Sequence, residues 1–185
     1  MIPQMREHYE HFWQSPGVVR RWPTGPMASA YPDFSILEIP PARKRVYYTY
    51  ATLGMSVRGR NEEIELHLHA ASPADDNVLI LTMVSFFHLT DCQLGLGHTV
   101  NFGQGWKSGS ACTHGLVSLP YLDGPKLEQS TSVGLKGIRF LWLLPITKEE
   151  VEYKKKNGLG ALEKRFEDNR KSFNYLDPER LSVVL

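Results

Sequence analysis

The clearest hydrophobic pattern in the chain lies at residues 63–70, where four apolar and four polar residues alternate. The apolar positions are Ile64, Leu66, Leu68 and Ala70, and the polar positions are Glu63, Glu65, His67 and His69. Because successive side chains of a strand point to opposite faces, the pattern predicts a strand with one core-facing side and one solvent-facing side. Such one-sided strands are typical of antiparallel or mixed sheets, so the pattern disfavours a doubly wound nucleotide-binding fold.

Further β-branched and aromatic runs predict more strands of the same sheet. They lie at residues 34–39, 46–55, 114–119 and 138–144, the last almost wholly apolar and therefore expected to be central. The glycine-rich stretch at residues 91–110 predicts loops with one short strand near residues 99–102.

Helix signals flank these strands. Residues 3–15 predict a short helix that ends before a Ser-Pro-Gly sequence. Ser72 and Pro73 predict the start of a second helix that runs to about residue 89. Thr147 and Glu150 have the spacing of a capping box, which predicts a helix start at that point. This helix is expected to end at residues 157–158, and another is expected over residues 160–169.

Length and composition fit a single domain over residues 1–185, with a short helix and an irregular segment at residues 1–30. We expect an α+β fold, with a mixed, largely antiparallel sheet packed with helices. The formal net charge of +1 supplies no broad positive field, so nucleic-acid binding is not expected. The two cysteines, the lack of a signal-peptide pattern and the lack of a long apolar run predict a cytoplasmic protein that does not enter a membrane.

The motifs of nucleotide-binding enzymes fail at the glycine-rich stretch. Trp106, not glycine, precedes Lys107 and Ser108, and a Walker loop requires glycine there. Cys112 and His114 are two positions apart on one predicted strand, so they point in parallel and do not form a nucleophile and base. The sequence therefore predicts neither a cofactor nor a catalytic residue.

A metal centre is the only enzyme-like site that the sequence offers as an alternative to a binding surface. His67 and His69 share a strand face and could reach one ion, with His98 or His114 as a third ligand, which would suit a metal-dependent hydrolase. The same residues also suit a solvent-facing strand on which glutamates pair with histidines. We favour the second interpretation and predict no metal.

A binding surface is the prediction that remains for the polar strand face and the glycine-rich loop beside it. Loops on rigid sheets often carry recognition, and tryptophan is enriched at binding hot spots. The predicted partner-binding residues are Glu63, Glu65, His67, His69, His98, Trp106 and Lys107.

Several motifs, in order along residues 36–183, resemble those of the suppressor-of-fused family. They are Ile39-Pro40-Pro41, Thr52-Leu53-Gly54-Met55-Ser56, Glu65-Leu66-His67-Leu68, Gly97-His98-Thr99, His114-Gly115-Leu116, Leu144-Pro145-Ile146-Thr147 with Glu149-Glu150, Asn157-Gly158, and Asp177-Pro178-Glu179-Arg180-Leu181-Ser182-Val183.

The resemblance implies an α/β sandwich-like domain that works by binding proteins and that has no catalytic residues to transfer. In animals the family restrains a transcription factor. Short bacterial relatives look like immunity proteins that neutralise a polymorphic toxin by direct contact. The chain ends near residue 185 without the second domain with which animal members clamp an extended peptide, so that clamp cannot be transferred to it. The expected function is therefore that of an immunity or antitoxin-like binding protein. A metal-dependent hydrolase and a general regulatory adaptor are the alternatives.

Overall fold

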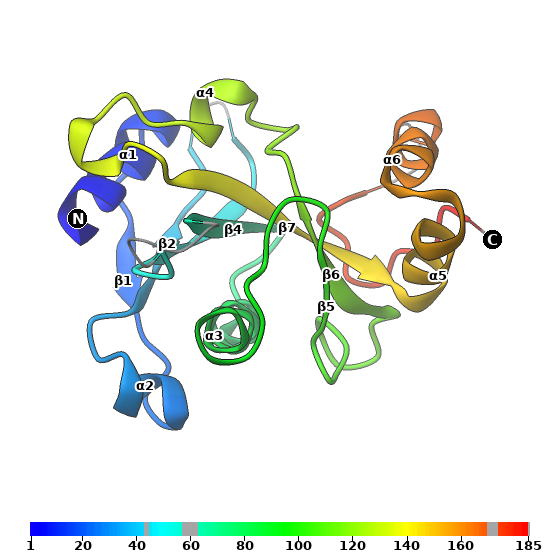
Figure 1. Ribbon diagram of the computed structural model, residues 1–185, viewed down its shortest axis with the longest axis horizontal. Coiled ribbons are helices and arrows are strands. Elements are labelled where there is room, and N and C mark those ends of the chain that lie inside the picture. Colours follow the sequence, from blue (N-terminus) through cyan, green and yellow to red (C-terminus); the bar gives the residue numbers. More distant parts are fainter. Residues whose placement is uncertain (43–44, 57–62, 170–173, 185) are drawn as a thin grey trace.

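A mixed β-sheet runs through the centre of the computed structural model, which describes residues 1–42, 45–56, 63–169 and 174–184 (Figure 1). Within these residues the sheet has seven strands in the order β1-β2-β3-β4-β7-β6-β5. The strands are β1 (Val18–Arg20), β2 (Ser35–Ile39), β3 (Tyr48–Leu53), β4 (Ile64–Ala70), β5 (Thr99–Asn101), β6 (Cys112–Ser118) and β7 (Arg139–Thr147). The helices are α1 (Ile2–Trp13), α2 (Pro26–Ala30), α3 (Asp75–Thr90), α4 (Pro125–Glu128), the 3-10 turn η1 (Val133–Leu135), α5 (Lys148–Asn157) and α6 (Leu159–Asp168).

The sheet is antiparallel except at its centre. Strands β4 and β7 pair in parallel, with Leu66 opposite Leu141, whereas the other neighbouring strands pair antiparallel. A parallel pair requires a long crossover, and here it is made by the chain that contains α3, β5 and β6. The predicted α+β class with a mixed, largely antiparallel sheet is confirmed.

Helices cover both faces of this sheet. Helix α3 packs on one face, over the largest apolar cluster, which includes Ile64, Leu66 and Leu68 of β4. On the opposite face, α1 and η1 cover a second cluster on β2, β3 and the start of β7. Helices α5 and α6 cover a third cluster on β6 and the end of β7. Figure 1 shows these two helical groups at opposite ends of the molecule.

Burial on both faces overturns one expectation. The alternation of β4 is present, but its polar face is not exposed to solvent: Glu65, His67 and His69 are 0–1% exposed. The reason is topological, because β4 is the central strand of the seven, and α1 and the loop after β6 cover its polar side.

Other elements agree with the sequence to within a few residues. Helices α1, α5 and α6 occupy the predicted positions, and the capping box is formed, with Thr147 N donating to Glu150 Oε2 at 2.9 Å. The predicted cap of α3 is wrong, because the helix begins at Asp75 with Ala74 as its N-cap and without a side-chain capping bond. The short elements β1, α2 and α4 were not predicted.

Close packing at one glycine of β6 makes a specific prediction. A Cβ atom on Gly115 would lie 2.5 Å from Leu143 Cδ1 and 2.9 Å from Phe102 Cε1. Replacing Gly115 with alanine should therefore lower the free energy of unfolding by about 1–3 kcal/mol, measured by urea denaturation. The control is Gly160→Ala in α6, where a Cβ meets nothing within 4 Å. That variant should be as stable as the native chain or more stable by about 0.4–1 kcal/mol. Equal effects of the two substitutions would contradict this account.

Candidate functional site

The polar face of β4 meets the loop that follows β6 at a buried cluster, here called the histidine–aspartate centre (His67, His69 and Asp123). His69 Nε2 lies 3.0 Å from Asp123 Oδ2, and His67 Nε2 lies 3.5 Å from the same oxygen. The side chains of both histidines are fully buried, and that of Asp123 is 4% exposed. The centre sits between the two helical groups, with Trp13 of α1 on one side and Trp142 of β7 on the other.

A second layer of hydrogen bonds orients two of the three side chains. Trp13 Nε1 donates to Asp123 Oδ1 at 2.8 Å, which leaves Oδ2 to face the histidines. Thr49 Oγ1 lies 3.0 Å from His69 Nδ1 and also accepts from Arg45 Nη1 at 2.7 Å. His67 differs, because neither of its ring nitrogens has a hydrogen-bond partner among the described residues.

Burial and the carboxylate have opposite effects on the protonation of this cluster. Burial lowers the pKa of His69 to about 4, although the hydrogen bond with Asp123 acts in the other direction. Burial alone would raise the pKa of Asp123, but its interactions with His67 and His69 outweigh that effect and hold the pKa far below its usual range. At neutral pH the centre is therefore an ionised carboxylate beside a neutral His69.

Glu65, on the same face, is bound by residues outside the histidine–aspartate centre and has a structural role in the sheet. Its carboxylate accepts from Thr52 Oγ1, from the backbone N–H groups of Gly54 and Ser56, and from Ser56 Oγ. Burial raises its pKa, although these hydrogen bonds act to lower it. Glu65 thus ties β4 to the end of β3.

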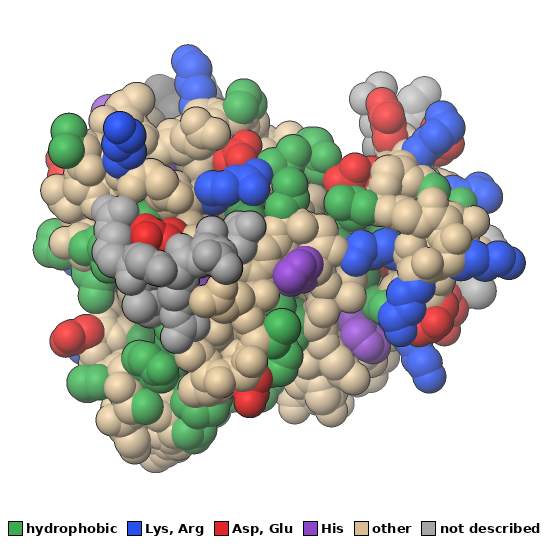
Figure 2. Space-filling model, in the orientation of Figure 1, with side chains coloured by type: hydrophobic (Ala, Val, Ile, Leu, Met, Phe, Trp, Pro, Cys, Tyr) green, Lys and Arg blue, Asp and Glu red, His purple; other side chains and the backbone are tan. Residues whose placement is uncertain are grey.

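A groove opens on the surface beside the centre, between the loop that carries Asp123 and helix α6. Its volume is about 930 Å³. Figure 2 shows it as a hollow with hydrophobic side chains between the body of the molecule and the α5–α6 end. We call it the aromatic groove. Its lining residues are Ser118, Tyr121, Leu122, Trp142, Leu144, Gly160, Glu163, Lys164, Phe166, Glu167 and Tyr175.

Trp142 connects the aromatic groove with the histidine–aspartate centre. Its ring contacts His69 at a centroid distance of 5.6 Å on one side and Tyr175 at 5.4 Å on the other. Its Nε1 is buried and has no hydrogen-bond partner among the described residues. At the mouth of the groove, Tyr121 is 58% exposed, and its hydroxyl donates to Glu163 Oε1 at 3.0 Å. The groove thus has an aromatic floor and a charged rim.

The predicted partner-binding residues do not form one surface. Glu65, His67 and His69 are buried under α1, and Trp106 is 1% exposed in the core on the α3 side. Of the remaining three, His98 is exposed, and Glu63 and Lys107 are half-buried. The expectation that all seven line an accessible surface is therefore wrong, while a binding role for the accessible ones stays a prediction.

The third ligand of the predicted metal alternative also differs. The cluster of possible ligands that the described residues form is completed by Asp123, not by His98 or His114. Asp123 lies 54 positions after His69 in an Asp-Gly-Pro turn, so no spacing along the chain marks it as a partner. Burial raises the pKa of the Cys112 thiol, so it is no activated nucleophile.

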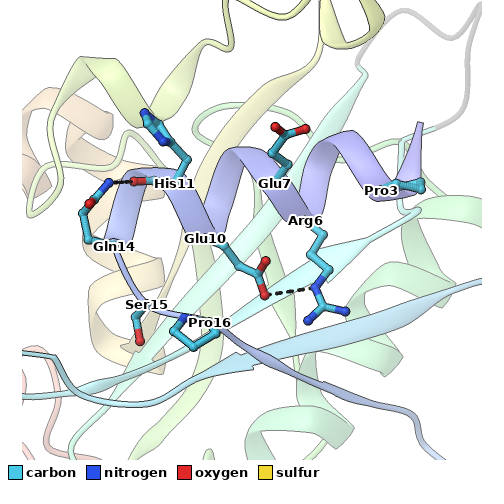
Figure 3. A pocket seen from close by; sticks show the side chains of 8 residues that line it. All are labelled: Pro3, Arg6, Glu7, Glu10, His11, Gln14, Ser15 and Pro16. Carbon is cyan, nitrogen blue, oxygen red and sulfur yellow. Dashed lines mark hydrogen bonds and ion pairs between the residues drawn. The ribbon is translucent and has the colours of Figure 1, made fainter.

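A second hollow, of about 520 Å³, lies along the outer side of α1 (Figure 3). Two of its charged side chains pair with each other: Arg6 Nε is 2.9 Å from Glu10 Oε1, which also accepts from Gly17 N. These contacts join α1 to the following turn, and we assign the hollow no ligand.

Comparison with known proteins agrees with this architecture. The family model of the suppressor of fused protein (SUFU) matches residues 31–181. A suppressor-of-fused homolog from Neisseria gonorrhoeae is 28% identical, with a TM-score of 0.84 over 99% of this chain and 96% of that chain. A search of curated proteins finds no match.

Two further structures share the fold at lower identity. The structure of a Sufu–Fu complex matches with a TM-score of 0.66 and 15% identity over 98% of this chain and 91% of that chain. Drosophila Suppressor of Fused matches with a TM-score of 0.59 and 17% identity over 81% of this chain and 42% of that chain. In the described residues, no helix has the length and apolar character needed to cross a membrane. With the family model covering most of its length and the sheet agreeing with these structures, the chain belongs to the suppressor-of-fused family.

Proposed function

We propose that this chain is an immunity protein of the cytoplasm that neutralises a toxin by direct contact, and that the toxin binds in the aromatic groove. Family membership supports protein binding, since one structure with the same fold is that of a Sufu–Fu complex. The observation that carries the placement is the groove itself, which combines concavity, aromatic side chains and a charged rim on one accessible surface.

The chemistry of the groove suits an apolar side chain of a protein partner. Binding hot spots are desolvated aromatic pockets with polar surroundings, and Trp142, Phe166 and Tyr175 form such a floor. Tyr121 and Glu163 meet across the mouth, where a partner can replace their exposed hydrogen bond at little cost.

The hydrolase alternative fits the structure less well. The side chains of the histidine–aspartate centre are at most 4% exposed, so a substrate cannot reach them without movement of Trp13, Trp142 or the covering loop. A regulatory adaptor would use the same groove as an immunity protein, and the identity of the bound protein distinguishes the two.

The experiment has two stages. Tagged protein is used to capture partners from its native cytoplasm, and the captured protein is identified by mass spectrometry. A stoichiometric partner whose activity falls on binding supports the immunity function. A stoichiometric partner with no toxic activity overturns it in favour of an adaptor.

Affinity for the captured partner then tests the groove. Replacing Tyr121 and Leu122 together with alanine should weaken binding by about 30-fold or more, because two exposed apolar contacts are removed from the rim. The control is Val133→Ala, an apolar residue 91% exposed on η1, outside the groove, which should bind like the native chain. If His98→Ala or Lys107→Ala weakens binding and the groove variant does not, the partner lies instead over the predicted loop surface.

A further inference from the structure

We propose that the histidine–aspartate centre binds one divalent cation of the zinc class through His67 Nε2, His69 Nε2 and Asp123 Oδ2. The ion would hold the loop after β6 against β4 as a structural site. The proposal does not rest on the proposed function, since it concerns a centre beneath the surface.

The distances from the carboxylate oxygen to the two histidines are close to those of a zinc site. Zinc binds nitrogen and oxygen at about 2.0–2.2 Å, so neighbouring ligands of a tetrahedral ion lie about 3.3–3.5 Å apart. Asp123 Oδ2 is 3.5 Å from His67 Nε2 and 3.0 Å from His69 Nε2. One ligand atom from each of the three side chains lies within 4.8 Å of the other two.

His67 supplies the observation that points to a ligand. Its imidazole is fully buried, and neither ring nitrogen has a hydrogen-bond partner among the described residues. Its Nε2 lies 3.5 Å from Asp123 Oδ2, and this contact is too long to satisfy the ring by a hydrogen bond. A buried polar group without a hydrogen bond costs about 1–3 kcal/mol, so a further interaction is expected to offset that cost. A cation bound by Nε2 would supply one.

Outer hydrogen bonds allow two of the three ligands, His69 and Asp123, to carry the correct protons. Thr49 Oγ1 can donate to His69 Nδ1 when Nε2–H points at Asp123, or accept from Nδ1–H when Nε2 binds an ion. Trp13 Nε1 holds Asp123 through Oδ1 in both states and leaves Oδ2 for the ion. Such outer partners are typical of metal-binding histidines and carboxylates.

The positive charge of Arg45 acts against an added cation. Its guanidinium donates to Tyr47 O, Thr49 Oγ1 and Pro40 O, and none of these is a proposed ligand. Two imidazoles and one carboxylate favour zinc, whereas magnesium and calcium prefer all-oxygen ligands. The expected ion is therefore zinc or another divalent cation that binds imidazole nitrogen strongly.

The test compares metal content and thermal unfolding. Protein stripped with a chelator and reloaded with zinc chloride should retain one zinc per chain after desalting. At a free zinc concentration about 100-fold above Kd, Tm should rise by about 5–10 °C. Native protein that retains no zinc after reloading overturns the proposal.

Two variants separate this centre from adventitious binding. His67→Phe removes one ligand and the unpartnered nitrogens, so it should lose zinc and its Tm response while the zinc-free protein stays as stable as the native chain. Asp123→Asn can keep the bond with Trp13 but should also lose zinc, because an amide oxygen is a poor zinc ligand. His98→Gln, which alters an exposed histidine outside the centre, should bind zinc normally. Zinc retained by both His67→Phe and Asp123→Asn would place the ion elsewhere and overturn the proposal.

Discussion

Replacing Arg180 with alanine is expected to lower the free energy of unfolding by about 3–5 kcal/mol. The guanidinium forms a two-pronged ion pair with Glu150, with Nη1 2.8 Å from Oε1 and Nη2 2.8 Å from Oε2. Nη2 also donates to Pro145 O at 2.7 Å. The side chains of Arg180 and Glu150 are 4% and 0% exposed, so the substitution leaves a buried carboxylate without its counter-charge.

The ion pair joins helix α5 to the C-terminal segment, and Arg180 also binds the end of β7 through Pro145 O. Glu150 is the third residue of α5 and completes its capping box, while Arg180 belongs to the C-terminal segment that also carries Tyr175 of the aromatic groove. Glu150 Oε1 further accepts from Val183 N. Loss of Arg180 should therefore also release the segment that forms one wall of the groove.

Chemical denaturation monitored by circular dichroism measures this effect. Lys155→Ala is the control, because Lys155 pairs with Glu152 at 2.9 Å on the surface, where an ion pair contributes at most about 1 kcal/mol. Glu150→Gln combined with Arg180→Met should be less destabilised than Arg180→Ala, since no buried charge is left unpaired. A loss below about 1 kcal/mol for Arg180→Ala would contradict the assigned role of the ion pair.

Local signals in the sequence predicted the elements that depend on neighbouring residues. The capping box at Thr147 and Glu150 needs only four consecutive residues, and the structure has it. The alternation of β4 likewise predicted which side chains share a face. The short helices α2 and α4 were missed, since four or five residues after a glycine show no periodicity.

Properties set by distant pairing could not be predicted in the same way. Whether the histidine face of β4 is wet depends on β7, which pairs with it more than 60 positions later, and on Trp13 of α1. Asp123 joins the histidines only because the loop after β6 crosses this face. The sequence therefore predicted that His67 and His69 share a face, but it did not predict their burial or the contact with Asp123.

Trp106 is another residue whose burial could not be predicted from its neighbours in the sequence, and its replacement should have a large effect on stability. The sequence suggested a binding hot spot, but the structure places its ring in the core against α3, where Nε1 donates to Asn77 Oδ1 at 2.8 Å. Trp106→Ala should lower the free energy of unfolding by about 3–5 kcal/mol, through lost burial and a cavity. Partner affinity, measured where the variant is still folded, should stay within about twofold of the native value. A weakened affinity in the folded variant would restore the hot-spot interpretation.

A double-mutant cycle isolates the hydrogen bond from the packing of the ring. Trp106→Phe leaves Asn77 Oδ1 without its donor, and Asn77→Ala leaves Trp106 Nε1 without its acceptor, so each should cost about 1–3 kcal/mol. The double variant leaves neither of these two atoms behind. Its loss should be smaller than the sum of the single losses by about 1 kcal/mol or more. Additive losses would mean that the bond contributes nothing, and that packing alone holds the glycine-rich loop on α3.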